Sequence, residues 1–220
     1  MYYNRPEYTT DHMSSLIRVT GEGSVFAVPD QAKLSLGVIT ENKDVNTAQR
    51  QNNEIMRNVI QGLLTMGIQN KDIQTSLYRI EPQYVYENGQ QNLKGYQVNH
   101  QLQITVEDVG GTGAVIDRAV SQGANSVSSI QFTVSSPDAF YNRALSLAVN
   151  SAQQKAMAIS RDLGVTLNRF PVKVTELSKG FQPGPVPYQG AVLSQGSPVP
   201  VQTGENEITA RIEAEFFYTP

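Results

Sequence analysis

The sequence has no cysteine in its 220 residues, which excludes disulfide bonds, thiolate zinc sites and a cysteine nucleophile. It has only two histidines, His12 and His100, and no nucleophile-elbow pattern accompanies them. The net charge is −3, and the charged residues are scattered along the chain. Because proteins that bind nucleic acid normally carry a basic stripe, we expect no nucleic-acid partner.

Long apolar runs are also missing. The first 19 residues, MYYNRPEYTTDHMSSLIRV, contain neither the basic start nor the apolar run of about 7–15 residues that a secretory signal requires. The apolar runs elsewhere are only a few residues long. We therefore predict a disordered tail at residues 1–14, no membrane span and a cytoplasmic location.

Apolar residues at helical spacing predict three helices, at about residues 45–66, 112–122 and 137–163, each followed by a glycine. The third is the longest, and its predicted inner stripe is Phe140, Ala144, Ala148, Ala152, Ala156, Ile159 and Leu163. Because most of these side chains are alanine, we expect this helix to lie close to a sheet or to another helix.

Between the helices, polar and apolar residues alternate with the period of a strand, most clearly at residues 94–107 and 207–216. Burial of one face only is typical of antiparallel sheets with a wet face. Asn88-Gly89 is a hairpin signal. Strands and helices do not alternate strictly; the predicted order is β-β-α-β-β-β-α-β-α-β-β. The fold class expected is therefore α+β, with mixed or antiparallel sheets packed against three main helices.

The pattern allows one domain at residues 15–219, or two small subdomains. The second reading groups 15–80 with 137–219 as a main core and treats 81–136 as an inserted subdomain. Residues 180–203 are rich in proline and glycine and predict a loop or arm. Its apolar residues are candidates for contact with a partner: Phe181, Val186, Tyr188, Val192 and Leu193.

The glycine-rich turn Gly110–Gly113 opens the second helix. A phosphate-binding loop of the Walker type would need a lysine followed by serine or threonine, and a dinucleotide loop would need a different glycine spacing. Neither pattern is present. We interpret the turn as a helix start with Thr112 as the N-cap, and keep an anion site as the minority reading.

His100 stands on the apolar face of the strand at residues 94–107 and is interpreted as a hydrogen-bonded core residue rather than a ligand or a base. Asp30, Glu205 and Glu207 lie near strand ends, where carboxylates usually form turns or a solvated face. The sequence identifies no catalytic constellation, no metal site and no cofactor.

Four segments carry a family resemblance. They are a glycine pair with a Pro-Asp turn and an alternating strand in VTGEGSVFAVPDQAKLSLGVITE, a Gly-Ala-Asn before a strand at residues 123–125, an alanine-rich helix with Lys155-Ala156, and the closing strand in PVQTGENEITARIEAEFF. In this order they resemble the SIMPL-domain family of bacterial proteins of unknown biochemical function, over about residues 16–219. The resemblance implies an α+β fold, no established catalytic residues, oligomeric assembly and, for some relatives, protection against oxidative stress. Many relatives are periplasmic or lie at the cell surface.

Two hypotheses about function remain at this point. The first is a non-enzymatic bacterial protein that forms a homo-oligomer and has a stress-related role. The second is a small-ligand-binding module or an unrecognised enzyme, with a pocket near His100 or Gly110–Gly113.

Overall fold

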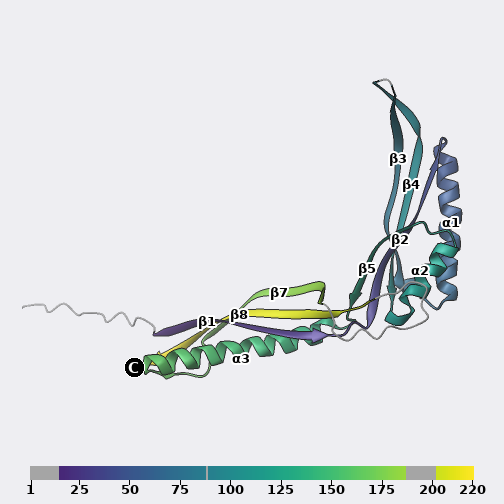
Figure 1. The fold of residues 1–220 in the computed structure, drawn as a ribbon. Helices are drawn as coiled ribbons and strands as arrows, with labels where there is room; N and C mark the ends of the chain where they lie inside the picture. Colours follow the sequence, from purple (N-terminus) through teal and green to yellow (C-terminus); the bar gives the residue numbers. More distant parts are fainter. Residues whose placement is uncertain (1–14, 88, 187–201) are drawn as a thin grey trace, which may run out of the picture. The chain divides into compact units, whose positions relative to one another are not determined.

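The computed structural model describes residues 15–87, 89–186 and 202–220, and for residues 178–186 only the backbone. It confirms the α+β class, with three α-helices and two antiparallel sheets (Figure 1). In chain order the elements are β1 (Leu16–Ala27), β2 (Gln31–Asn42), α1 (Val45–Thr65), η1 (Asn70–Asp72), β3 (Ile73–Glu87), β4 (Gln90–Val106), η2 (Val109–Gly111), α2 (Thr112–Ser121), β5 (Ser126–Thr133), α3 (Pro137–Leu163), β6 (Thr166–Leu167), β7 (Lys173–Val186) and β8 (Glu205–Thr219).

The three helices lie where the sequence predicts them, but the order of strands differs. Two strands, not three, separate α1 from α2, and three strands follow α3. The stretch before α2 forms two long strands because one hairpin turn joins them, as Asn88-Gly89 predicts, with Glu87 paired to Gln90. Gly89 has φ +78°, a conformation that glycine adopts without steric cost.

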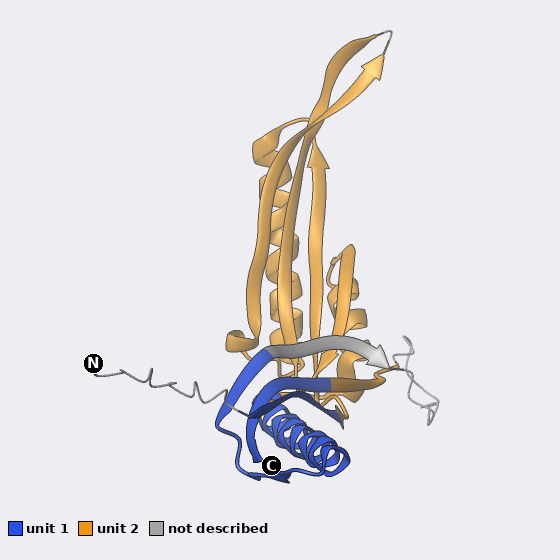
Figure 2. Ribbon diagram, turned by 90° about the vertical axis from the view of Figure 1, so that its left-hand side faces the viewer, with its two compact units in different colours: residues 1–25, 137–182, 208–220 blue, residues 26–136, 183–207 orange. Residues whose placement is uncertain are grey.

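The chain forms two compact units (Figure 2). The first consists of residues 1–25, 137–182 and 208–220, and the second of residues 26–136 and 183–207. Residues 26–80, which the sequence-based division groups with 137–219, thus lie in the same unit as 81–136. The reason is pairing at long range: β2 pairs with both β4 and β5, and the sequence alone does not show which strands pair.

The first unit packs α3 against a sheet in which β8 lies between β1 on one side and β6 and β7 on the other. The alternation of β8 is confirmed, since the apolar side chains predicted on one face are all buried: Ile208, Ala210, Ile212, Ala214 and Phe216. The expected close approach of α3 is also present. A Cβ atom at Gly21 would lie 2.0 Å from the carbonyl oxygen of Ala148, and one at Gly23 would lie 2.2 Å from that of Ala144.

The inner face of α3 is narrower than predicted. Its buried residues are Tyr141, Ala144, Ala148, Ala152, Ala156 and Ser160. Phe140 is only partly buried, and Ile159 and Leu163 are exposed, so these three assignments were wrong. A spacing of four residues in the alanine run places Ser160 inward in line with Ala156 and leaves Ile159 on the outer side.

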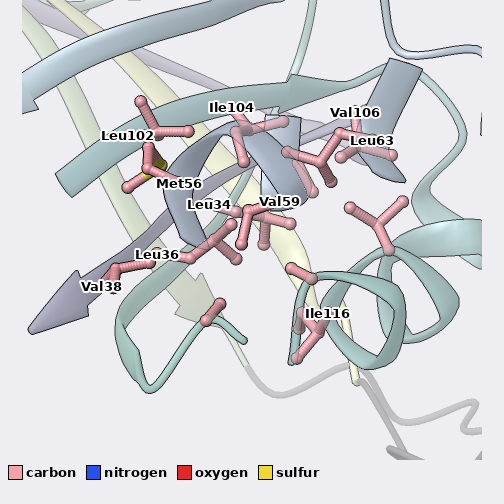
Figure 3. Packing of buried hydrophobic residues seen from close by; sticks show 14 residues of the cluster. Leu34, Leu36, Val38, Met56, Val59, Leu63, Leu102, Ile104, Val106 and Ile116 are labelled. Carbon is pink, nitrogen blue, oxygen red and sulfur yellow. The ribbon is translucent and has the colours of Figure 1, made fainter. Parts of the chain in front are cut away.

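The second unit is a four-stranded antiparallel sheet in the order β3-β4-β2-β5, with α1 and α2 on one face. Its core joins side chains of β2 and β4 to the inner faces of both helices (Figure 3): Leu34, Leu36, Val38, Met56, Val59, Leu63, Leu102, Ile104, Val106, Val115, Ile116 and Ala119. Asp44 caps α1 by accepting a hydrogen bond from the Thr47 amide at 2.8 Å. We call the helix-covered side of this sheet its inner face.

The Pro-Asp link between β1 and β2 has a structural role. The carboxylate of Asp30 accepts hydrogen bonds from the Ser135 amide at 2.6 Å and from the Ser135 hydroxyl at 2.7 Å. The Asp30 amide donates to the Thr133 carbonyl at 3.1 Å. Asp30 therefore fastens the start of β2 to the end of β5, in keeping with its interpretation as a turn former.

Substitution of Gly21 by alanine tests the close approach of α3. Because the new methyl group would overlap the Ala148 carbonyl, the helix must move away, and overpacking of this kind costs about 1–3 kcal/mol. We expect the free energy of unfolding, measured with urea, to fall by about that amount. Ser24→Ala, at an exposed position of the same strand, is the control and should change stability little. Equal stability of the two variants would contradict the proposed contact.

Candidate functional site

The hairpin formed by β3 and β4 is longer than the sheet to which it belongs. Pairing between β2 and β4 ends at Asn42 opposite Tyr96, whereas β3 and β4 stay paired up to Glu87 opposite Gln90. Both views show the hairpin continuing past β2 and α1 (Figures 1 and 2). Within the described residues, the outer part of the hairpin is thus a two-stranded ribbon without a helix over it.

The inner face of this ribbon is apolar and exposed. Residues that pair across antiparallel strands share a face, so the row begun by Ile80 opposite Val98 continues through Tyr84 opposite Leu93. We define the hairpin face as its five large exposed residues, followed by their exposed fractions: Tyr78 (42%), Ile80 (37%), Tyr84 (48%), Tyr86 (75%) and Leu93 (51%). It lies on the same side of the sheet as the core: Tyr78 and Ile80 flank the part that β2 also pairs with, and Tyr84, Tyr86 and Leu93 continue outward from it.

The charged residues of β3 lie on the other face. Arg79 and Glu81 alternate with the residues of the hairpin face, and Glu87 follows Tyr86 in the same alternation. The guanidinium of Arg79 is 3.3 Å from the carboxylate of Glu81. The ribbon is therefore amphipathic, with one uncharged apolar face and one charged face.

Sequence reasoning missed this surface. The signal was present, because Tyr78, Ile80, Tyr84 and Tyr86 recur at every second residue apart from Pro82. Alternation alone assigns such a row to one face of a strand, and only the strand pairing shows that this face extends beyond the described helices.

His100 lies on β4 where the covered and uncovered parts of the inner face meet. Its ring makes an edge contact with Tyr78, with ring centroids 5.0 Å apart, and its Nε2 atom is 3.4 Å from the Thr75 hydroxyl. The Nδ1 atom is buried and has no hydrogen-bond partner among the described residues. Burial lowers the pKa of His100 below its ordinary value of 6.5, because the charged imidazolium loses water.

The glycine-rich turn is a helix start, but the cap is not Thr112. Asp108 accepts a hydrogen bond from the Gly110 amide at 3.0 Å, and the Gly111 amide donates to the Asp108 carbonyl at 3.0 Å. Thr112 already has helical dihedral angles, and its hydroxyl is buried without a partner among the described residues. An anion at this turn would need the Gly110 amide as a hydrogen-bond donor, but that amide already donates to the Asp108 carboxylate. The geometry therefore disfavours an anion site here.

A hollow of about 310 Å³ lies beside this turn, between the end of α1 and the start of α2. Its walls combine apolar side chains with three carboxylates: Met66, Gly67, Ile68, Gln69, Asp72, Thr105, Val106, Glu107, Asp108, Gly111, Ala114 and Val115. The volume is at the lower end of the range for ligand sites, which is roughly 300–1,000 Å³. The lining would suit a small cation with an apolar part better than a phosphate.

A second hollow of about 260 Å³ lies where the hairpin leaves the sheet, next to Gly95 and Tyr96. Its charges are largely paired, since Glu41 lies 3.6 Å from the Lys94 ammonium and accepts a hydrogen bond from Gln97 at 2.8 Å. In the described part of the chain, no three histidine, aspartate or glutamate residues are grouped so that they could hold a metal ion.

The arm residues chosen from the sequence are only partly within the structure. The backbone of Phe181 and Val186 belongs to β7, while Tyr188, Val192 and Leu193 lie outside the described residues. The tail predicted at residues 1–14 also lies outside them. No helix within the described ranges combines the length and the apolar character needed to cross a membrane.

Comparison with known proteins places this fold in a family. The chain matches the family described as SIMPL, protein of unknown function (DUF541), over residues 17–216. The chain belongs to the SIMPL family. The resemblance of the four sequence segments is thereby confirmed, and the family description supplies no activity that could be assigned to the hairpin face or to either hollow.

Similar proteins are found in several bacteria. The 26 kDa periplasmic immunogenic protein of Brucella melitensis biotype 1 is 34% identical over 209 residues, which cover 91% of this chain and 83% of the relative. The protein of the same name from Brucella abortus strain S19 gives the same values. The uncharacterized protein YggE of Escherichia coli strain K12 is 31% identical over 175 residues, covering 77% of this chain and 69% of that protein.

These relatives correct the expected location. Two of them are named as periplasmic proteins, so the prediction of a cytoplasmic location is wrong. The prediction rested on the first residues, which lack the pattern of a secretory signal. The lack of cysteine is compatible with the periplasm, because a protein there can do without disulfide bonds when it has a sizeable apolar core.

The lowered pKa of His100 predicts a dependence of stability on pH. Below about pH 6.5 the unfolded chain binds more protons at this residue than the folded chain, so the free energy of unfolding should fall as the pH falls. Urea unfolding at pH 7.5, 6.5 and 5.5 measures the effect. His100→Gln should flatten the slope, whereas His12→Gln should leave it unchanged. Equal slopes for wild type and His100→Gln would show that His100 titrates as an ordinary exposed residue.

Proposed function

We propose that this chain is a non-enzymatic protein of the bacterial periplasm whose working form is a homo-oligomer. The periplasmic location follows the names of the two Brucella relatives. A role in stress protection is included because the sequence resembles a family in which some members have that role. We expect neither a nucleic-acid partner nor a cofactor.

The observation that supports assembly is the exposed apolar face of the hairpin. Its five side chains leave roughly 500 Å² accessible, taking about 200 Å² for each fully exposed large side chain. Apolar patches of several hundred Å² on a folded protein often mark contact sites. α1 and α2 cover the inner face over β2 and β4, where the core lies, and a protein surface is the natural cover for the apolar residues of the hairpin that the helices leave open.

A competing proposal is a module that binds a small ligand. The observation in its favour is the hollow of about 310 Å³ beside Gly111, with Asp72, Glu107 and Asp108 around it. A small organic cation that binds there would raise the melting temperature of the protein, because ligands that bind only the folded state stabilise it. Asp108 also holds the turn before α2, so Glu107→Gln is the better variant for this test.

Light scattering coupled to size-exclusion chromatography tests the assembly. At a chain concentration of about 100 μM, even contacts with a Kd near 1 μM would be filled. We expect a mass that is a multiple of the 24.2 kDa chain. A single species at the chain mass would refute the proposal. A variant in which a Gly/Ser linker replaces residues 180–203 tests whether the arm contributes, as its apolar residues predict; in that case the mass should decrease.

A further inference from the structure

We infer that the hairpin face is covered by the same face of a second copy of this chain, so that two hairpins pack face to face about a two-fold axis. This inference rests on the proposed function, because it names the partner and the surface of the proposed assembly. Three features of the described residues support it: the absence of charge on the face, its area, and the proline in its edge strand.

The first feature is charge. Every member of the hairpin face is uncharged, and the charges of β3 at Arg79, Glu81 and Glu87 lie on the opposite side of the ribbon. Two such faces can therefore meet without taking an ion out of water, which would cost several kcal/mol for each unpaired charge. A strongly charged partner would find no complementary group on this face. Self-association fits the chemistry better than an acidic or basic partner does.

The second feature is area. Two copies of the hairpin face bring together roughly 1,000 Å² of accessible side-chain surface, using about 200 Å² for each fully exposed large side chain. Specific protein interfaces start at about 1,000–1,200 Å² in total. The apolar side chains alone thus reach the lower limit, and neighbouring polar atoms would add to it. Three of the five residues are tyrosines, which are enriched at interfaces because they bury a large ring and keep the hydroxyl at the rim.

The third feature decides between the face and the edge of the hairpin. β3 is the outer strand of its sheet, so a second copy could instead extend the sheet by pairing with β3. Pro82 lies in the middle of that strand, opposite Tyr96, and has no amide hydrogen to donate. Proline in an edge strand is a common device against strand pairing. The geometry therefore favours packing through the face, with the sheets about 10 Å apart.

The absence of cysteine from the sequence allows a direct test. A single cysteine introduced as Tyr86→Cys would lie on the hairpin face, and Glu87→Cys would place the matched thiol one residue away on the opposite face. With a bifunctional thiol-reactive cross-linker about 10 Å long, we expect covalent dimers from Tyr86→Cys and almost none from Glu87→Cys. Equal yields from the two variants would overturn the inference.

Mass measurement on a second pair of variants completes the test. Tyr84→Ser with Tyr86→Ser removes two rings from the face, while Arg79→Ser with Glu81→Ser changes two residues on the charged side. The first double variant should weaken the face-to-face contact and raise its Kd at least tenfold. The second double variant should leave the mass of the assembly unchanged. Urea unfolding checks that both remain folded, as expected for exposed side chains.

The outcomes separate the two levels of the proposal. If the wild-type chain is a monomer at about 100 μM, the proposed function fails, and the inference fails with it. If the wild-type chain is an oligomer but the Tyr84→Ser, Tyr86→Ser variant has the same mass, assembly stands and the inference is overturned, because the copies then meet through another surface. If the mass of the assembly decreases only in the Tyr84→Ser, Tyr86→Ser variant, the result supports both the proposed assembly and the inferred surface.

Discussion

The second unit depends on a difference in length between a helix and a hairpin. The 21 residues of α1 span about 32 Å, since a helix rises about 1.5 Å per residue, whereas the 17 residues of β4 span about 56 Å at about 3.3 Å per residue. A helix that starts at the end of β2 and runs back along the sheet cannot cover the whole hairpin. The sequence nevertheless continues the apolar row outward through Tyr84, Tyr86 and Leu93. The exposed face therefore requires both long strands and an apolar pattern. Long strands without the pattern would give a polar hairpin, and the pattern without long strands would give a short one.

The first unit shows the opposite solution. The 27 residues of α3 span about 40 Å, close to the length of the 12-residue strand β1. Helix and strand approach so closely that a side chain at Gly21 or Gly23 would overlap the helix backbone. The alanines of α3 contribute little apolar area each, so stability here depends on close packing rather than on large side chains. In this unit a helix of matching length covers the apolar row of β8, whereas in the second unit the apolar row of the hairpin extends beyond its helix.

The same comparison explains how far the sequence could predict the structure. Periodicity located α1, α2 and α3 to within a residue, and the alternation of β8 identified its buried side. The pattern on α3 failed at Phe140, Ile159 and Leu163, because spacing indicates a face without showing how wide the covered stripe is. His100 was placed on the correct face, yet it lies at the boundary of the covered region beside Tyr78. The hairpin face could not be recognised, because an apolar row has the same pattern whether a helix, water or another protein covers it. Strand pairing decides that question, and it depends on residues far apart in the chain.

The way the hairpin is protected also constrains the kind of assembly. Pairing through an exposed edge is open-ended, because each added strand presents a new edge, and it can lead to fibres. Pro82 interrupts the donors of β3, and Arg79 and Glu81 place charge on the outer side of the same strand. Contact through a face has a different symmetry. When both partners use the same patch, each patch is covered by one neighbour only. The contact is then a closed dimer with two-fold symmetry. Larger closed assemblies then need a second, separate surface on each chain. A strand with a blocked edge and an apolar face is thus suited to a closed contact rather than to open-ended strand pairing.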